Sequence, residues 1–113
     1  MNLKLRNSSL IYRKLKISDY SEFKRLFYEC FKKKISFKFF KWRYFSNKPS
    51  FCYGAFKKSR LIANVGMISL ILNNNKHEKI FSRHSSMVLK KYRGYGVYSD
   101  LLKRVKKKIS KNA

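Results

Sequence analysis

The apolar residues of this chain follow a helical period in some stretches and an extended period in others. The first helical stretch begins near Ser18 and Asp19, which are favourable N-cap residues, and ends at the lysines of 32–34. Apolar residues recur there at spacings of three and four, and they are Phe23, Leu26, Phe27, Cys30 and Phe31. A second helix is predicted for the aromatic segment 36–46, which stops at a turn containing Pro49.

Four other stretches have the β-branched and aromatic composition of strands, at 10–16, 51–56, 61–72 and 79–89. The last three are separated by short polar turns and predict an antiparallel meander. The 61–72 strand is apolar on both sides, so we expect a covering layer on each face of the sheet. Strict alternation would place Ile62, Ile68 and Leu70 on one face, and Leu61, Val65, Met67 and Ile71 on the other.

A last helix is predicted from Val97 to Ile109, because Leu101 and Val105 continue an apolar stripe opposite a lysine-rich face. The predicted order of elements is therefore β-α-α-β-β-β-α. This order indicates an α/β (α+β) fold in which helices cover a sheet. A chain of 113 residues has room for one core, so residues 1–113 are expected to form a single domain.

The composition is strongly basic, with 29 Lys and Arg against 5 Asp and Glu and a formal net charge of +24. Hydrophobic residues make up 44% of the chain, which excludes a disordered basic tail. Two explanations of the charge remain open: a codon supply that favours lysine, or a polyanionic partner. The basic residues are spread over turns, helix ends and outer helix faces, whereas a nucleic-acid interface gathers them in a stripe with aromatics. A small basic nucleic-acid-binding protein stays the alternative function.

The two cysteines, Cys30 and Cys52, are too few for a disulfide scaffold and have apolar neighbours, which favours a reducing, cytoplasmic setting. The amino terminus lacks a signal-peptide pattern, and the longest apolar run, 65–72, is far shorter than the roughly 20 residues that cross a bilayer. No membrane partner is expected. The cysteines, His77 and His84 lack the paired spacing of zinc ligands, so no metal is expected either.

The loop 90–96 joins the last strand to the last helix and is the most informative segment of the sequence. Gly94 and Gly96 stand just before the helix, where backbone N–H groups are unpaired and the helix dipole is positive. Together with the basic residues beside them, they predict a phosphate-binding loop. A Walker A loop would end in Gly-Lys-Ser/Thr, and a dinucleotide fingerprint would have a third glycine where Ser99 stands, so both are disfavoured.

The segment Lys91-Tyr92-Arg93-Gly94-Tyr95-Gly96 resembles the acyl-coenzyme A loop of the GNAT acetyltransferases. The pattern of that family is Gln or Arg, two residues, Gly, one residue, then Gly or Ala, and Lys91 stands at its first position. The predicted order of elements is also similar to the family's, over about residues 10–110, and the resemblance implies its mixed sheet. It implies an acyl-CoA-dependent N-acyltransferase that moves acetyl from acetyl-CoA, its co-substrate, to an unidentified amine acceptor.

By this resemblance, backbone N–H groups from Lys91 to Gly96 hold the coenzyme A pyrophosphate, and the strand end 87–89 pairs with the pantetheine arm. The implied cofactor-binding residues are Met87, Val88, Leu89, Lys91, Tyr92, Arg93, Gly94, Tyr95 and Gly96. The family commonly supplies a backbone amide of the same strand as donor for the thioester oxyanion, which implies a donor near Met87 or Val88.

The catalytic acid and base are not identified by the resemblance. His84 lies on the predicted cofactor strand and Glu78 near its beginning, so both are candidates. Each has a plainer interpretation, as a strand residue and as a solvated turn carboxylate. GNAT domains continue after this helix with further strands, so we expect this chain to be the amino-terminal portion of the fold. A second chain could then complete the sheet, because the outer edge of the cofactor strand would otherwise be unpaired.

Overall fold

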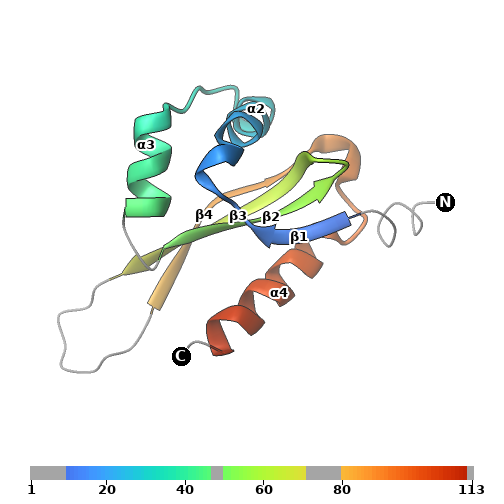
Figure 1. Ribbon diagram of the computed structural model, residues 1–113. Coiled ribbons are helices and arrows are strands. Elements are labelled where there is room, and N and C mark those ends of the chain that lie inside the picture. Colours follow the sequence, from blue (N-terminus) through green and yellow to red (C-terminus); the bar gives the residue numbers. More distant parts are fainter. Residues whose placement is uncertain (1–9, 47–49, 71–79, 112–113) are drawn as a thin grey trace.

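The computed structural model describes residues 10–46, 50–70 and 80–111, which form a four-stranded sheet between two layers of helices (Figure 1). In chain order the elements are β1 (Leu10–Lys14), the 3-10 turn η1 (Ile17–Asp19), α2 (Tyr20–Phe31), α3 (Phe37–Lys41), the π-helical turn η2 (Trp42–Ser46), β2 (Phe51–Lys57), β3 (Arg60–Leu70), β4 (Ile80–Val88), the 3-10 turn η3 (Lys90–Tyr92) and α4 (Val97–Lys111). The strand order is β1-β2-β3-β4, and every neighbouring pair is antiparallel. The predicted α/β class and the order β-α-α-β-β-β-α are confirmed.

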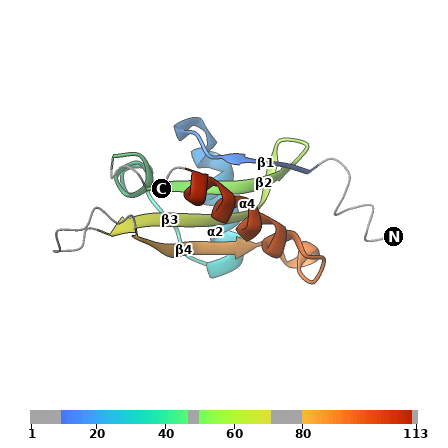
Figure 2. The same cartoon turned by 90° about the horizontal axis from the view of Figure 1, so that it is seen from below.

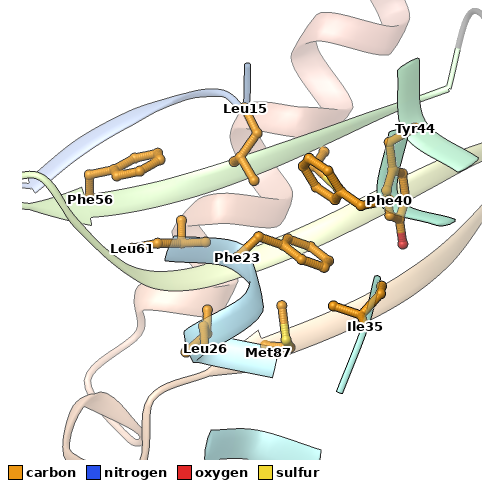
Figure 3. Packing of buried hydrophobic residues seen from close by; sticks show 10 residues of the cluster. Leu15, Phe23, Leu26, Ile35, Phe40, Tyr44, Phe56, Leu61 and Met87 are labelled. Carbon is orange, nitrogen blue, oxygen red and sulfur yellow. The ribbon is translucent and has the colours of Figure 1, made fainter. Parts of the chain in front are cut away.

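Helices cover both faces of the sheet, as the apolar character of the middle strand predicted. α2 and α3 lie on one face, while α4 lies on the other and crosses β2 and β3 (Figures 1 and 2). The core under α2 and α3 is rich in aromatic rings (Figure 3) and consists of Leu15, Phe23, Leu26, Ile35, Phe40, Tyr44, Cys52, Phe56, Leu61 and Met87. The core under α4 is mostly aliphatic and consists of Tyr53, Ala55, Ile62, Ala63, Val65, Met67, Tyr92, Val97, Leu101 and Val105. None of the helices in the described part of the chain is long and apolar enough to cross a membrane.

The faces of β3 differ from the strict alternation that the sequence predicted. Consecutive residues of β2 pair with Leu61 and Ala63, so Ile62 is an extra residue in β3. A bulge of this kind moves the side chains that follow to the opposite faces. The core under α2 and α3 therefore receives Leu61 and Ile68, whereas the core under α4 receives Ile62, Val65 and Met67. The predicted faces are therefore wrong for Leu61 and Ile62, whereas Ile68 does lie opposite Val65 and Met67 as predicted. The side chains of Leu70 and Ile71 lie outside the described part.

Asp19 occupies the N-cap position of α2, but its carboxylate does not bond to that helix. It accepts hydrogen bonds from the Lys16 N–H at 2.7 Å and from the Arg13 guanidinium at 2.8 and 3.0 Å. The bonds from Arg13 hold the pKa of Asp19 below its usual value. Asp19 therefore joins the end of β1 to the start of α2.

β4 is the outer strand of the described sheet, and β3 is its neighbour there. β4 ends at the glycine loop, which leads into α4 and lies at the lower right of Figure 2. The second chain expected from the sequence would pair at the outer edge of β4, and that pairing stays a prediction.

Candidate functional site

β4 contains a bulge near the end that leads into the glycine loop. Asn64 of β3 pairs with Met87 and Gly66 pairs with His84, so two residues of β4 stand opposite one residue of β3. Within the bulge, Ser85 has a φ of 52°, a left-handed conformation that is uncommon for residues other than glycine. The bulge re-aims the backbone and side chains of β4 just before the loop.

Buried polar contacts from the α3 side hold the bulge in this shape. Asn64 Nδ2 donates to the Ser85 carbonyl at 3.1 Å, and Tyr44 Oη lies 2.7 Å from Ser85 Oγ. Tyr44 reaches Ser85 because Gly66 leaves room: a Cβ there would lie 2.6 Å from the Tyr44 ring and 2.8 Å from the His84 carbonyl oxygen. Burial raises the pKa of Tyr44 to about 12, so its hydroxyl stays protonated and neutral in this contact. The bulge is thus part of the packed core.

The loop after β4 turns in two steps before α4 begins. In η3, the N–H groups of Tyr92 and Arg93 donate to carbonyls within the loop. Gly94 and Gly96 then adopt φ angles of 88° and 81°, in the left-handed region that favours glycine. The two glycines therefore redirect the chain into α4, and the N–H groups of Tyr92 and Arg93 are already used within the loop.

α4 begins directly after the second glycine. Its first α-helical hydrogen bond runs from the Asp100 N–H to the Gly96 carbonyl at 3.0 Å, so the N–H groups of Val97, Tyr98 and Ser99 precede it. These three residues line a neighbouring pocket. The positive end of the α4 dipole is therefore directed toward that pocket.

This pocket has a volume of about 420 Å³ and lies between α2, the end of β4 and the start of α4. Its lining consists of Cys30 and Phe31 from α2, the β4 segment 86–88, and the loop and helix segments 92–94 and 96–99. We call it the loop pocket. It combines a bulged strand edge, a glycine loop and a helix N-terminus.

The carbonyl oxygen of Val88 is the main polar contact point at this end of β4. Arg93 Nε donates to it at 2.9 Å, and the Cys30 thiol, a weak donor, lies 3.6 Å away. Tyr98 Oη donates to Ser86 Oγ at 2.8 Å. These bonds join α2, the loop and α4 to the edge of β4 around the pocket.

Six of the nine residues implied for cofactor binding line the loop pocket, namely Met87, Val88, Tyr92, Arg93, Gly94 and Gly96. Met87 and Tyr92 also belong to the two cores, one to each. Leu89 and Lys91 line a second pocket that also includes Tyr92. Tyr95 is half-buried and lines neither pocket. The roles of all nine stay predictions.

The candidate His84 is bonded to Arg43 of η2, whose Nη2 lies 2.7 Å from His84 Nδ1. A guanidinium carries only donors, so Nδ1 accepts and the neutral ring carries its hydrogen on Nε2. Partial burial and the nearby Arg43 charge lower the pKa of His84, which favours the neutral ring at pH 7. His84 does not line the loop pocket. The other candidate, Glu78, lies outside the described residues.

The described residues contain no cluster of three or more His, Cys, Asp or Glu side chains that could hold a metal ion. Cys30 and Cys52 are free thiols. Cys52 is buried, and burial raises the pKa of its thiol, so it stays protonated and unreactive.

Several pocket residues were missed by sequence reasoning. Val97, Tyr98 and Ser99 could have been found, because the first turn of a helix that follows a glycine loop faces the same space as the loop. Cys30 and Phe31 carry no such pattern in the sequence. They end an apolar stripe, and only the packing of α2 beside the loop brings them to the pocket.

The fold is shared with solved acetyltransferase structures. An aminoglycoside acetyltransferase from an uncultured soil sample, solved with trehalose, has a TM-score of 0.78 and 11% identity, with 94% of this chain and 73% of that chain covered. A predicted acetyltransferase from Clostridium acetobutylicum, solved with acetyl-CoA, has a TM-score of 0.72 and 16% identity, covering 91% and 75%. A ribosomal-protein-alanine N-acetyltransferase from Brucella melitensis biovar Abortus has a TM-score of 0.71 and 17% identity, covering 91% and 73%. At these identities the likeness establishes the fold.

The sequence itself matches the acetyltransferase (GNAT) domain over residues 11–113. No curated protein sequence matches it. The domain match includes β1 to α4 and therefore every element that forms the loop pocket. This chain belongs to the GNAT acetyltransferase family.

Proposed function

We propose that this chain binds acetyl-coenzyme A at the loop pocket and transfers the acetyl group to an amine. One observation carries the proposal: the pocket of about 420 Å³ connects a bulged sheet edge to a helix N-terminus through two left-handed glycines. A pyrophosphate suits the helix N-terminus, because unpaired N–H groups and the helix dipole attract anions. An amide-containing arm suits the bulged sheet edge, because a strand edge offers backbone donors and acceptors.

The pyrophosphate would meet the N–H groups that follow η3, from Gly94 into the first turn of α4. Those of Tyr92 and Arg93 donate within the loop, so the binding surface is shorter than the segment from Lys91 to Gly96. The side chain of Arg93 is exposed beside the pocket and brings a full positive charge. Glycine at 94 allows close approach, because a Cβ there would meet nothing of the protein within 4 Å and would occupy open space.

The pantetheine arm would pair with β4 at residues 86–88. The Val88 carbonyl already accepts from Arg93 Nε and is approached by Cys30 Sγ. A carbonyl has two lone pairs, so an incoming amide N–H can join or replace the bond from Arg93. Binding would then release the Arg93 side chain toward the phosphate groups.

In the transfer, the lone pair of a neutral amine attacks the thioester carbonyl carbon and the carbon–sulfur bond breaks. The nitrogen loses one proton as it becomes an amide, and the departing thiolate takes up a proton, so the products are an amide and a thiol. The developing oxyanion needs a donor, for which a backbone N–H of β4 near Met87 or Val88 is proposed. His84 suits a donor role and not that of a base, because Arg43 occupies Nδ1 and Nε2 carries hydrogen. The strongly positive protein favours the neutral form of an approaching amine, which is the reactive form.

The test is isothermal titration calorimetry with acetyl-coenzyme A on the wild type and on a Gly94→Val, Gly96→Val variant. We expect binding by the wild type and none by the variant, since β-branched residues disfavour positive φ and fill the pocket. The matched control is Lys38→Ala, Lys41→Ala on α3, which removes two charges away from the loop pocket and should bind as the wild type does.

Thiol release with a panel of amines then tests transfer, using a polyamine, an aminoglycoside and a peptide amino terminus. The proposal fails if the wild type gives no heat with acetyl-coenzyme A. Salt-sensitive binding of a single-stranded oligonucleotide in that case would establish the alternative function of a basic nucleic-acid-binding protein.

A further inference from the structure

A second pocket, of about 490 Å³, lies next to the loop pocket and shares Tyr92 with it. Its walls come from the outer face of α2, the turn between β2 and β3, and the loop after β4. The β2–β3 turn and the β4–α4 loop lie at the same end of the sheet (Figures 1 and 2). We call this second pocket the turn pocket.

The charges on the α2 side of the turn pocket neutralise one another. Arg25 bonds to Glu22 at 2.9 Å and to Glu29 at 2.7 Å. Arg60 Nε lies 3.4 Å from the same Glu22 carboxylate. Two arginines and two carboxylates therefore form one network without net charge.

Three lysines of the turn pocket stand outside this network: Lys57, Lys58 and Lys91. The ammonium groups of Lys57 and Lys91 lie 5.9 and 5.4 Å from the centroid of the Tyr92 ring. Within the described part of the chain, none of the three lysines forms an ion pair with a carboxylate. The pocket thus holds three positive charges, two of them beside the Tyr92 ring, and an anion is the complementary ligand.

The turn that carries two of these lysines has an unfavourable backbone. Lys58 and Ser59 have φ angles of 48° and 69°, so both central residues of the turn are left-handed. Turns of this kind normally use Asn-Gly or Asp-Gly, because other side chains strain the backbone there. The chain instead places Lys58 between Lys57 and Arg60, where like charges also repel. The tight turn requires this backbone, so the unfavourable feature is the choice of Lys58 and Ser59 at its centre.

We propose that the turn pocket binds the 3′-phosphate of the coenzyme A molecule whose pyrophosphate lies at the loop pocket. This inference rests on the proposed function. Coenzyme A carries a phosphate monoester on its ribose in addition to the pyrophosphate, and such a group is largely dianionic at neutral pH. Two anionic groups on one ligand match two pockets that share Tyr92, one recognising phosphate by backbone N–H groups and the other by lysine side chains.

The experiment compares coenzyme A with 3′-dephospho-coenzyme A by calorimetry on the full chain at low salt. The test variant is Lys57→Gln, Lys58→Asn, in which asparagine tolerates the left-handed backbone of residue 58. The control is Lys38→Ala, Lys41→Ala, which removes the same charge from α3. We expect the wild type and the control to prefer coenzyme A by about tenfold, as two exposed ion pairs would give. The test variant should bind both ligands as weakly as the wild type binds the dephospho form.

Equal affinity of the wild type for the two ligands would overturn the inference while leaving the proposed function intact. A test variant that loses affinity for both ligands to the same extent would also overturn it, because the lysines would then act only through the general field. Binding of neither ligand by the wild type would reject the proposed function and this inference with it. A test variant that keeps the preference for coenzyme A but loses binding of a single-stranded RNA would assign the lysines to nucleic acid.

Discussion

The two faces of the sheet are packed with different kinds of side chain. Under α4 the core is mostly aliphatic, with Val65, Leu101 and Val105 almost fully buried. Under α2 and α3 it is aromatic, and Phe23 and Phe40 lie with their ring centroids 4.7 Å apart. The face under α2 and α3 also contains polar groups, Tyr44 and Asn64, that bond to Ser85 of β4.

This difference explains how the candidate site is assembled. The aromatic face fixes the shape of β4, because Tyr44 and Asn64 both bond to Ser85 in the bulge. The aliphatic face fixes the position of α4, whose first turn lines the loop pocket. The site therefore depends on specific contacts on one face and on general apolar burial on the other.

The largest expected effect is on stability, from Phe23→Ala on the aromatic face. Phe23 is fully buried and contacts three other rings, so its removal should lower the free energy of unfolding by about 3–5 kcal/mol. Leu101→Ala, fully buried on the aliphatic face, is the matched change and should lower it less, because no ring pairs are lost. Urea unfolding followed by circular dichroism measures both. An equal or larger loss for Leu101→Ala would contradict the proposed difference between the faces.

Gly66→Ala should have the next largest effect, a loss of about 1–3 kcal/mol in the free energy of unfolding. The added Cβ would lie 2.8 Å from the His84 carbonyl oxygen, which is backbone and cannot move aside alone. Gly54→Ala on the same face is the control, because its two nearest contacts are the ends of the Leu61 and Leu15 side chains. We expect the control to lose less, and the same urea titration tests it. Equal losses in the free energy of unfolding would show that the backbone of β4 moves as readily as the leucine side chains do.

The sequence predicted the elements and the glycine loop because both depend on local patterns. Helical spacing identified α2 and α4, and Gly94 and Gly96 identified the loop. Bulges could not be predicted, because they depend on the register between two strands. The extra residues at Ile62 and in β4 therefore upset the predicted faces and left the shape of the site unknown.

Contacts between distant segments were equally hidden from the sequence. Arg43 and His84 are 41 residues apart, and no pattern in the sequence joins them. The same holds for Cys30, whose thiol approaches Val88 from the end of α2. Such pairs follow from how α2 and α3 lie over β4, which requires the packed structure.

Tyr44→Phe should lower the free energy of unfolding by about 1 kcal/mol, since it removes one buried hydrogen bond to Ser85. Tyr98→Phe removes a hydroxyl bond to Ser86 of similar length, 2.8 Å, that is exposed, and it should have a smaller effect. Urea unfolding of the two variants compares a contact from the aromatic face with one from the start of α4. A larger loss for Tyr98→Phe would mean that α4, and not the aromatic face, holds the bulge.

The smallest expected effect is a pH dependence of stability that also comes from the aromatic face. Partial burial and the Arg43 charge lower the pKa of His84 in the folded state, so its protonation favours unfolding. This contribution to stability is present above the ordinary histidine pKa of about 6.5 and is lost as the pH falls through the lower folded value. The urea midpoint should therefore fall between pH 7.5 and 5.5 in the wild type, and fall less in His84→Gln. If the urea midpoint of His84→Gln falls as much as that of the wild type, the Arg43–His84 contact does not contribute to the pH dependence of stability.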